Sequence, residues 1–504
     1  MMDNQYILMG TLRLSKNASD LVEEFTEIFT ECTDEFISEG QSWERRECTV
    51  DGDKVEVHLG ITAAPAHRFF YRLQKCIGKK MGREYHLGVK DAIVDRLKIQ
   101  FEMGTEPVTE LKMPFVEKLE FNDKTCTAIL KDVDNDFIIE GAVERLMKRI
   151  EERVERQYYE GKEEFWELME ESPYREPKWD KDPSSEMVDR GWIVRGPTKG
   201  KWFYRPEITA ILNAMKEIAK KEILEPMGFQ EVIESNFVPF DVWRRTGHMM
   251  GVPNEVYYFS EPATRDPQFW QEFQDKVYIT NDVDVDELKE LVSEPKGGIV
   301  YAQCPNIYWS FEKAVIPEED LPLKIFENTV ASARYESGGR HGIERSDEFH
   351  RIEIVYIGRP EQLNELKEEL TERFHYVFDE ILEINWRMAW VTPWYMQQSG
   401  QEGVEDETEH ILGTIDFEAY LPYRGDKADS DNWLEFQNLT IAGDKFTDAF
   451  TIKTQRGDLW SGCSGIGLER WAVVFLAQNG LDPEKWPDGF KEYLSELPKG
   501  FRSY

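Results

Sequence analysis

The chain has 504 residues, with 61 Lys and Arg against 98 Asp and Glu, a formal net charge of −37 and a pI near 4.7. This charge argues against a general nucleic-acid binder, because a negative field repels phosphate and any contact with RNA must be local. No stretch approaches the roughly eighteen apolar residues that span a bilayer, and the first residues do not resemble a signal peptide. We expect a soluble cytoplasmic protein that does not enter a membrane and that has two or three domains.

The cysteines lie far apart in a long chain without a secretory signal. We therefore expect no disulfide framework, so that reduced thiols are available as metal ligands. The six cysteines are Cys32, Cys48, Cys76, Cys126, Cys304 and Cys463.

Residues 1 to about 135 alternate short strand-like runs with helical ones, which predicts an α+β domain on an antiparallel sheet. The strand-like runs are residues 5–10, 54–59 and 125–130, and the helical runs are residues 21–36 and 65–80.

Residues 61–100 form a basic island in an acidic chain. Phe69, Phe70, Tyr71 and Tyr85 lie within it and could stack on bases, so the island is a candidate RNA-binding surface. The alternative is that these aromatic residues belong to a core and that the lysines solvate a helix. The candidate tRNA-binding residues are Arg68, Arg72, Lys75, Lys79 and Lys80.

Apolar residues recur at helical spacing among many charges from residue 137 to about 171, which predicts a long amphipathic helix that ends the N-terminal domain at residue 172. The polar, proline-containing stretch after it predicts a linker over residues 173–204. Pro206 then opens a helix that continues to residue 223, and residues 228–233 are expected to form a strand. We expect a catalytic domain over residues 205–504, with two inserted helices near residues 260–300 at 269–276 and 285–292.

Residues 332–356 carry two expected strands around a glycine-rich, charged loop. Arg334 and Glu336 lie two apart, so that both side chains share one face of a strand and can contact a phosphate and a base amine. Phe349 could stack on a purine, and Arg345 could fold over phosphates. The pattern resembles motif 2 of the class II aminoacyl-tRNA synthetases. A hairpin that a salt bridge merely stabilises is the alternative.

A second motif lies near the C-terminus, where residues 460–470 carry three glycines and end on Arg470 before an apolar helix. This resembles motif 3 of the same synthetases, in which the arginine holds ATP. Between the two motifs, Glu435 is a candidate ligand for the magnesium ion that bridges ATP phosphates.

Cys304, Glu353 and Cys463 are candidate zinc ligands, since each falls in a segment expected to border the catalytic sheet. Two thiolates and a carboxylate suit zinc and leave one coordination position for a substrate. The alternative is that the two cysteines are small buried apolar residues.

Taken together, these motifs closely resemble the methanogenic-type (type 2) seryl-tRNA synthetases over essentially the whole chain. The resemblance implies a class II antiparallel sheet flanked by helices, an N-terminal tRNA-binding domain, a helix-turn-helix insertion, a homodimer, and one zinc ion per subunit that binds the serine amino group. The positions that match the family are Arg334, Glu336, Arg345, Ser346, Glu435 and Arg470 for ATP, Cys304, Glu353 and Cys463 for zinc, and Ala302, Arg351, Glu353, Gln398 and Asn438 for serine.

The expected activity is therefore the ligation of L-serine to tRNA(Ser) with ATP and magnesium, with Arg334, Glu435 and Arg470 as the catalytic residues. Two alternatives are an amino acid ligase that loads a carrier protein and a non-catalytic synthetase-like sensor of tRNA. One departure from the class pattern concerns the dimer contact: motif 1 usually ends its strand on a proline soon after the glycine, whereas here Gly228 is followed by a proline only at Pro239.

Overall fold

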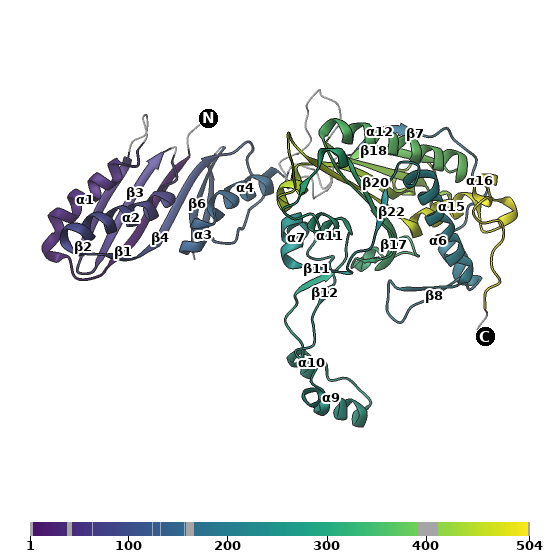
Figure 1. The fold of residues 1–504 in the computed structure, drawn as a ribbon, viewed down its shortest axis with the longest axis horizontal. Coiled ribbons are helices and arrows are strands. Elements are labelled where there is room, and N and C mark those ends of the chain that lie inside the picture. Colours follow the sequence, from purple (N-terminus) through teal and green to yellow (C-terminus); the bar gives the residue numbers. More distant parts are fainter. Residues whose placement is uncertain are drawn as a thin grey trace. The chain divides into compact units, whose positions relative to one another are not determined.

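A computed structural model gives the fold (Figure 1), and the chain divides into two compact units, Met1–Glu163 (unit 1) and Glu164–Tyr504 (unit 2). The structure describes residues 4–37, 43–62, 64–122, 124–131, 133–155, 157, 166–391 and 412–501.

Unit 1 is a six-stranded antiparallel sheet with four helices packed on one face, which confirms the α+β prediction (Figure 1). Alternate residues of its central strand point into the core, where Leu8 and Leu12 are fully buried. The strand order is β2-β3-β1-β4-β6-β5, with β1 Gln5–Leu14, β2 Trp43–Asp51, β3 Lys54–Thr62, β4 Val89–Glu102, β5 Val116–Asn122 and β6 Thr125–Leu130. The helices are α1 Val22–Asp34, α2 Ala66–Tyr85, α3 Asn135–Ile139 and α4 Ala142–Glu155.

The long helix predicted over residues 137–171 is wrong. Gly141 takes a left-handed backbone conformation with φ 72° and separates α3 from α4. Residues Trp166–Glu171 instead form β7, an edge strand of unit 2 that pairs with β18 (Trp386–Val391). Backbone pairing at a sheet edge has overridden the helical spacing, and the unit boundary lies near residue 163 rather than at 172.

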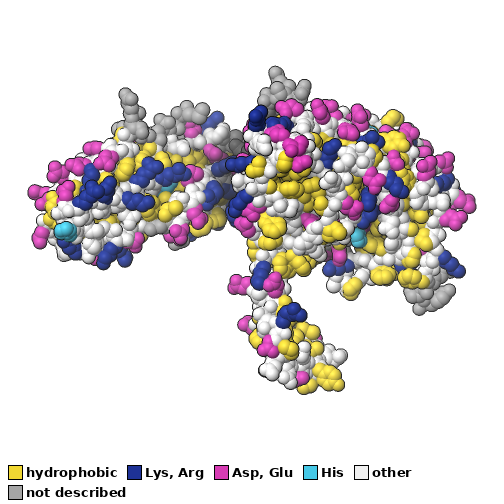
Figure 2. All heavy atoms as spheres, viewed as in Figure 1, with side chains coloured by type: hydrophobic (Ala, Val, Ile, Leu, Met, Phe, Trp, Pro, Cys, Tyr) yellow, Lys and Arg dark blue, Asp and Glu magenta, His cyan; other side chains and the backbone are white. Residues whose placement is uncertain are grey.

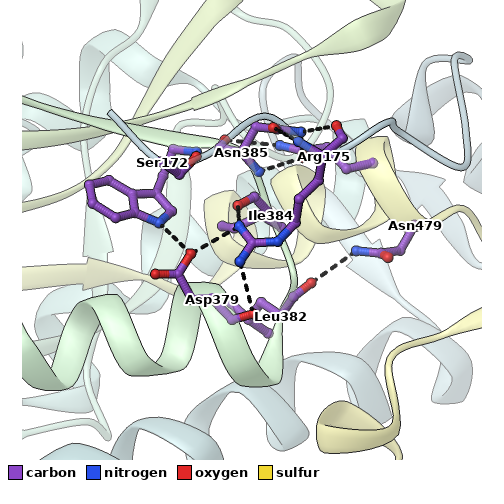
Figure 3. A network of polar contacts seen from close by, with 9 residues as sticks. Ser172, Arg175, Asp379, Leu382, Ile384, Asn385 and Asn479 are labelled. Carbon is purple, nitrogen blue, oxygen red and sulfur yellow. Dashed lines mark hydrogen bonds and ion pairs between the residues drawn. The ribbon is translucent and has the colours of Figure 1, made fainter. Parts of the chain in front are cut away.

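Residues 173–204 do not form the predicted linker, because they pack on unit 2. Figure 3 shows the polar network that attaches the start of this segment to unit 2. The Ser172 hydroxyl accepts from the backbone N–H of Trp386 at 2.9 Å, and Arg175 Nη1 lies 2.9 Å from Asp379 Oδ1. The Asn385 side chain accepts from the backbone N–H of Arg175 at 2.7 Å. The segment continues into α5 (Pro183–Asp189), β8 (Ile193–Arg195) and β9 (Trp202–Tyr204). A polar composition alone does not distinguish a free linker from a segment whose polar groups form hydrogen bonds and ion pairs with a folded unit.

Unit 2 is built on a nine-stranded sheet that is antiparallel except where β10 pairs with β15. The path runs β10-β15-β17-β22-β20-β19-β18-β7, and β16 pairs with β17. The bounds are β10 Gln230–Val232, β15 Leu323–Glu327, β16 Ala331–Ala333, β17 Glu348–Gly358, β19 Gly413–Tyr420, β20 Trp433–Gly443 and β22 Trp460–Gly467.

Helices α6 (Pro206–Ile218), α12 (Pro360–Tyr376) and α15 (Leu468–Asn479) flank this sheet and build its core (Figure 1). In α15 every residue except Arg470 is buried, so the apolar helix predicted after motif 3 is confirmed. Helix α6 begins at Pro206 as predicted and continues into a π-helical turn, Ala219–Leu224.

The two helices predicted near residues 260–300 are confirmed as α9 (Pro267–Thr280) and α10 (Val285–Leu291), which Figure 1 shows extending away from the sheet. They rise from a three-stranded sheet of β11 (Phe237–Pro239), β12 (Tyr258–Phe259) and β13 (Gly297–Ile299). No residue of either helix is buried.

Cys32 of α1 and Cys76 of α2 form a disulfide, so the expectation that the thiols are reduced is wrong for this pair. The two helices pack together and bring the Cα atoms to 5.9 Å, a proximity that spacing in the sequence does not reveal.

Within the described ranges, no helix has both the length and the apolar content to cross a membrane.

Candidate active site

The predicted motif 2 arginine lies directly after the short strand β16. Its Nε is 3.0 Å from a carboxylate oxygen of Glu336 and 3.0 Å from one of Glu255, and the guanidinium lies 5.7 Å from the ring centre of Tyr301. The Arg334 side chain remains 31% exposed, so that a ligand can reach it. Arg334 is thus held in place by groups that leave part of it open to an anion.

The motif 3 arginine meets the predicted magnesium ligand. Arg470 Nη1 donates to the Glu435 side chain at 3.0 Å and to its backbone oxygen at 2.8 Å. Its Nε donates to the backbone oxygen of Glu344 in the loop between β16 and β17, called here the motif 2 loop, at 3.2 Å. Glu435 also acts electrostatically on Arg334. The three predicted catalytic residues therefore converge on one region of the sheet.

The other predicted ATP residues lie in or beside the motif 2 loop. Arg345 is exposed, and a Cβ on Gly339 would lie 3.7 Å from its guanidinium carbon. Ser346 is buried, and its hydroxyl donates to backbone oxygens of the loop at 2.8 and 3.2 Å. Phe349 is half-buried in β17 opposite Ser332. Ser346 thus stabilises the loop, while Arg345 remains accessible from solvent.

Asp347 anchors this loop and was missed from the sequence. Its carboxylate accepts two hydrogen bonds from Arg340 at 2.7 Å and one from the Tyr257 hydroxyl at 2.6 Å. Burial alone would raise the pKa of Asp347, but these donors hold it below its usual value. No sequence spacing indicates this role, because Tyr257 comes from a different segment of the chain.

The predicted zinc ligands come together. Cys304 opens helix α11 (Cys304–Trp309), Glu353 lies in β17, and Cys463 lies in the neighbouring strand β22 opposite Val355. One ligand atom from each of the three residues lies within 4.8 Å of the others. Both cysteines are free thiols.

The electrostatics of this cluster favour a cation. Burial raises the pKa of Glu353, and Arg351, whose Nη2 lies 2.6 Å from a Glu353 oxygen, acts in the opposite direction. The hydrogen bond with Cys463 and burial raise the pKa of Cys304 well above its usual value. A bound cation would favour the charged forms of both groups, and two thiols with a carboxylate fit the donor set of zinc.

A half-buried lysine borders the cluster and was also missed. Lys445 opens α14 (Lys445–Phe450), and burial lowers its pKa to about 8, against the attraction of Cys304 and Cys463. Together with Arg351 it brings positive charge to the thiols. The sequence does not distinguish it from a surface lysine.

Two of the predicted serine-pocket residues meet at Gly465 in β22. A Cβ at that position would lie 2.0 Å from Arg351 Nη2, and the Gly465 N–H donates to the Asn438 side chain at 3.0 Å. Ala302 is half-buried, two residues before the first zinc candidate. Glu353 is the zinc candidate described above, and the fifth residue, Gln398, lies outside the described residues.

The predicted tRNA residues lie on α2 in unit 1. Arg68, Arg72, Lys75 and Lys79 are exposed at spacings of three and four, so they form one stripe along the helix. Figure 2 shows Lys and Arg side chains across the middle of the face where Figure 1 places α2. The fifth residue differs: Lys80 pairs with Glu31 of α1 at 3.1 Å and with Glu35, directly after α1, at 2.8 Å.

The aromatic residues of the basic island belong to a core, as the alternative interpretation expects. Phe69 and Phe70 are buried in the core of unit 1, and Tyr71 and Tyr85 pack against that core. They do not form a stacking platform. Arg68 also has a partner, since its Nη2 lies 2.7 Å from Glu144. Arg72, Lys75 and Lys79 thus form the accessible cationic part of the stripe.

Known proteins resemble both the N-terminal part and the whole of this chain. Residues 4–152 match a family described as a tRNA-binding domain. The type-2 serine-tRNA ligase of Methanothrix thermoacetophila is 42% identical over 99% of both chains. That of Methanococcoides burtonii is 38% identical over 99% of this chain and 100% of its own. The M. kandleri seryl-tRNA synthetase, solved in complex with an A. aeolicus tRNASec, shares 25% identity over 100% of this chain and 99% of its own, with a TM-score of 0.82.

Proposed function

Because the chain belongs to the type-2 serine-tRNA ligases, we propose that it activates serine as seryl-adenylate at the site formed by motifs 2 and 3, and that a zinc ion binds the serine amino group there. The chain is a class II aminoacyl-tRNA synthetase, a ligase of protein biosynthesis that acts on tRNA. Its reaction has two steps, formation of the adenylate and transfer of the seryl group to tRNA.

In the first step the serine carboxylate attacks the α-phosphorus of ATP. Arg334 neutralises charge on the α-phosphate, and Arg470 stabilises the leaving pyrophosphate. Both side chains are already held by carboxylates, Arg334 by Glu336 and Arg470 by Glu435, so little reorganisation is needed when ATP binds. Magnesium bound by Glu435 would neutralise phosphate charge.

In the second step a ribose hydroxyl of the terminal adenosine of tRNA attacks the acyl carbon and AMP leaves. The adenylate is already activated, so no side chain has to act as a nucleophile. The protein's task is to position the two reactants and to keep water away from the mixed anhydride. The convergence of Arg334, Glu435 and Arg470 on one region of the sheet supports the positioning part of that task.

Cys304, Glu353 and Cys463 would hold the zinc ion, which supplies a Lewis acid for a deprotonated amine. The observation that carries the zinc proposal is the convergence of these three side chains, whose ligand atoms lie within 4.8 Å of one another, with Cys304 and Glu353 buried. Amine binding admits any α-amino acid, so a small pocket must reject the others. The extra methyl group of threonine permits discrimination by binding of only ~10- to 200-fold.

A homodimer is part of the proposal, and exposed apolar residues between the end of β10 and the start of β11 support it. Ile233 is 79% exposed and Phe237 52% exposed in the segment that corresponds to motif 1. A second subunit that covered this segment would remove their apolar surface from water.

Replacing one thiol tests the zinc site. We expect Cys463→Ala to lose stoichiometric zinc and to lower serine-dependent ATP-pyrophosphate exchange by at least about a hundredfold, since substrate positioning at the ligand is lost. Metal content and exchange are measured on the same preparation. Cys48→Ala, a free cysteine of unit 1, is the matched control and keeps both. A metal-free Cys463→Ala protein with full exchange would contradict the zinc assignment.

A further inference from the structure

One segment of unit 2 is strongly basic, and neither motif accounts for it. Residues 190–205 carry five basic residues and no acidic one, in a chain whose net charge is −37. The five are Arg190, Arg195, Lys199, Lys201 and Arg205. Such a run within an acidic protein marks a local place where a polyanion can approach.

This segment forms the hairpin of β8 and β9, with a turn at residues 196–201 (the basic hairpin), which Figure 1 shows at the side of unit 2. Arg195, Lys199 and Lys201 are exposed on it. No carboxylate in the described parts of the chain forms an ion pair with any of the three. In the active site, by contrast, Arg334, Arg351 and Arg470 are each paired with a glutamate. These three charges are available to a ligand.

The basic hairpin is attached to the motif 2 loop by its backbone. The Gly200 oxygen accepts from the N–H of Asp347 at 2.7 Å, and the Trp202 indole donates to the Gly342 oxygen at 2.7 Å. Gly200 has φ 78°, and a Cβ there would lie 2.6 Å from Asp347 Oδ1, so glycine is needed for this close approach. The same loop contacts Arg470 through the Glu344 oxygen. The basic hairpin is therefore tied to a loop that borders the ATP site.

A cavity of about 710 Å³ lies between the basic hairpin, the motif 2 loop and α5. Arg195, Lys199, Lys201 and Arg340 line it, and Asp182 and Asp189 are the acidic residues on its wall. Asp182 accepts from the Ser184 N–H at 3.1 Å as the cap of α5, and Arg340 is paired with Asp347. The three hairpin cations therefore exceed the two carboxylates, Asp182 and Asp189, on the cavity wall. Exposed Phe203, at 57%, adds an aromatic surface on the same hairpin.

We propose that the basic hairpin binds the acceptor arm of tRNA, with Arg195, Lys199 and Lys201 on backbone phosphates near the 3′ end. This inference rests on the proposed function, because the acyl carbon of an adenylate at Arg334 is where the 3′ end must arrive. The hairpin is hydrogen-bonded to the loop that also holds Arg470, which puts its cations beside that destination. Phosphate contacts fix the register of the strand without reading its sequence.

The test compares a triple variant, Arg195→Ala with Lys199→Ala and Lys201→Ala, with the wild-type full chain. We expect the ratio of the tRNA charging rate to the serine-dependent exchange rate to fall at least about tenfold. The slope of log affinity for tRNA against log salt should become shallower by about 2 to 3, since each lost phosphate contact removes roughly 0.7 to 0.9. Lys199→Ala alone removes one cation at an exposed turn, so the same slope should become shallower by roughly 0.7 to 0.9.

A matched triple removes the same charge elsewhere on unit 2, at exposed Lys221, Lys313 and Lys485, and should leave both readouts at the wild-type value. An RNA minihelix with only the acceptor arm should lose affinity with the hairpin triple to the same extent as the full tRNA. An unchanged charging ratio and salt slope would overturn the proposal, as would a wild-type protein that fails to bind the minihelix. Absence of serine exchange in the wild type would instead contradict the proposed function.

Discussion

Gly465 shows how a single residue shapes the centre of the site. It lies in β22 opposite Glu353, and its missing side chain leaves room for the Arg351 guanidinium. Its N–H also orients Asn438. The glycine thus allows an arginine to lie against the zinc candidates, where it counters their negative charge.

We expect Gly465→Ala to displace Arg351 and to raise the KM for serine in exchange by about a hundredfold, because shifts near 1 Å in a positioning group have effects of that size. Steady-state exchange at varied serine measures this. Gly82→Ala in α2 is the control, since a Cβ there meets nothing within 4 Å. A Gly465→Ala enzyme with wild-type KM would contradict the role of Arg351.

His350 gives a pH-dependent test of the contact between motifs 2 and 3. Its Nδ1 lies 2.7 Å from Glu469, and this hydrogen bond raises the pKa of His350. A raised folded pKa contributes stability that is fully present below the unfolded pKa of about 6.5 and is lost as pH rises through the folded value. We expect His350→Gln to lower the calorimetric unfolding midpoint more at pH 6 than at pH 9.

His375 is the matched control with the opposite sign. Burial lowers its pKa, so that its protonation opposes folding at low pH. The loss of midpoint in His375→Gln should therefore be smaller at pH 6 than at pH 9. Equal losses at the two pH values for His350→Gln would show that its hydrogen bond with Glu469 carries no ionic character.

For single residues, the sequence predicts the chemical role of a side chain better than it predicts which side chains from other segments lie next to it. Arg334, Glu435 and Arg470 meet as expected, because each type is required by phosphate chemistry at a recognisable motif. Asp347 and Lys445 were missed because their importance comes from loss of contact with water and from partners in other segments, Asp347 being buried and Lys445 half-buried. One sequence contains no distances between such segments.

Among the elements, helix α2 carries the accessible cations of unit 1. Arg72, Lys75 and Lys79 line one face of the helix, while its opposite face builds the core through Phe70, Leu73 and Ile77. The two faces of α2 thus differ: one is apolar and buried in the core, and the other is positively charged and exposed.

Reversing the stripe tests whether this face binds tRNA. We expect Arg72→Glu with Lys75→Glu and Lys79→Glu to raise the KM for tRNA in charging at least about tenfold, since three phosphate contacts would become repulsive. Serine-dependent exchange is measured beside it as a check on unit 2.

The matched control reverses three exposed lysines on the strands and turns of the same unit, Lys54, Lys118 and Lys124, and should leave the KM for tRNA near the wild-type value. Equal increases in the two triples would mean that net charge, and not the stripe, governs the interaction. Unchanged charging in both would move the RNA surface away from α2.

The elements also show where sequence patterns fail. Helix α6, the two inserted helices and the apolar α15 have strong periodic or proline signals and were predicted. Strand β7 was mistaken for helix because its exposed, charged sequence gains its structure only by pairing with β18. An edge strand of this kind has no local signal of its own.

At the scale of the whole molecule, the net charge of −37 is not evenly spread. Exposed cations follow one face of α2, and three more lie together on the basic hairpin beside the motif 2 loop. Because a negative field repels phosphate, we expect contact with RNA only where such local groups of cations lie.

ATP-pyrophosphate exchange with each of the twenty amino acids shows whether this site makes seryl-adenylate. The protein is assayed for zinc first. We predict exchange with serine at one zinc per chain, with threonine weaker by about 10- to 200-fold. Exchange with glycine or alanine in place of serine would contradict the account in favour of a carrier-protein ligase, and no exchange with any amino acid would contradict catalysis at this site altogether.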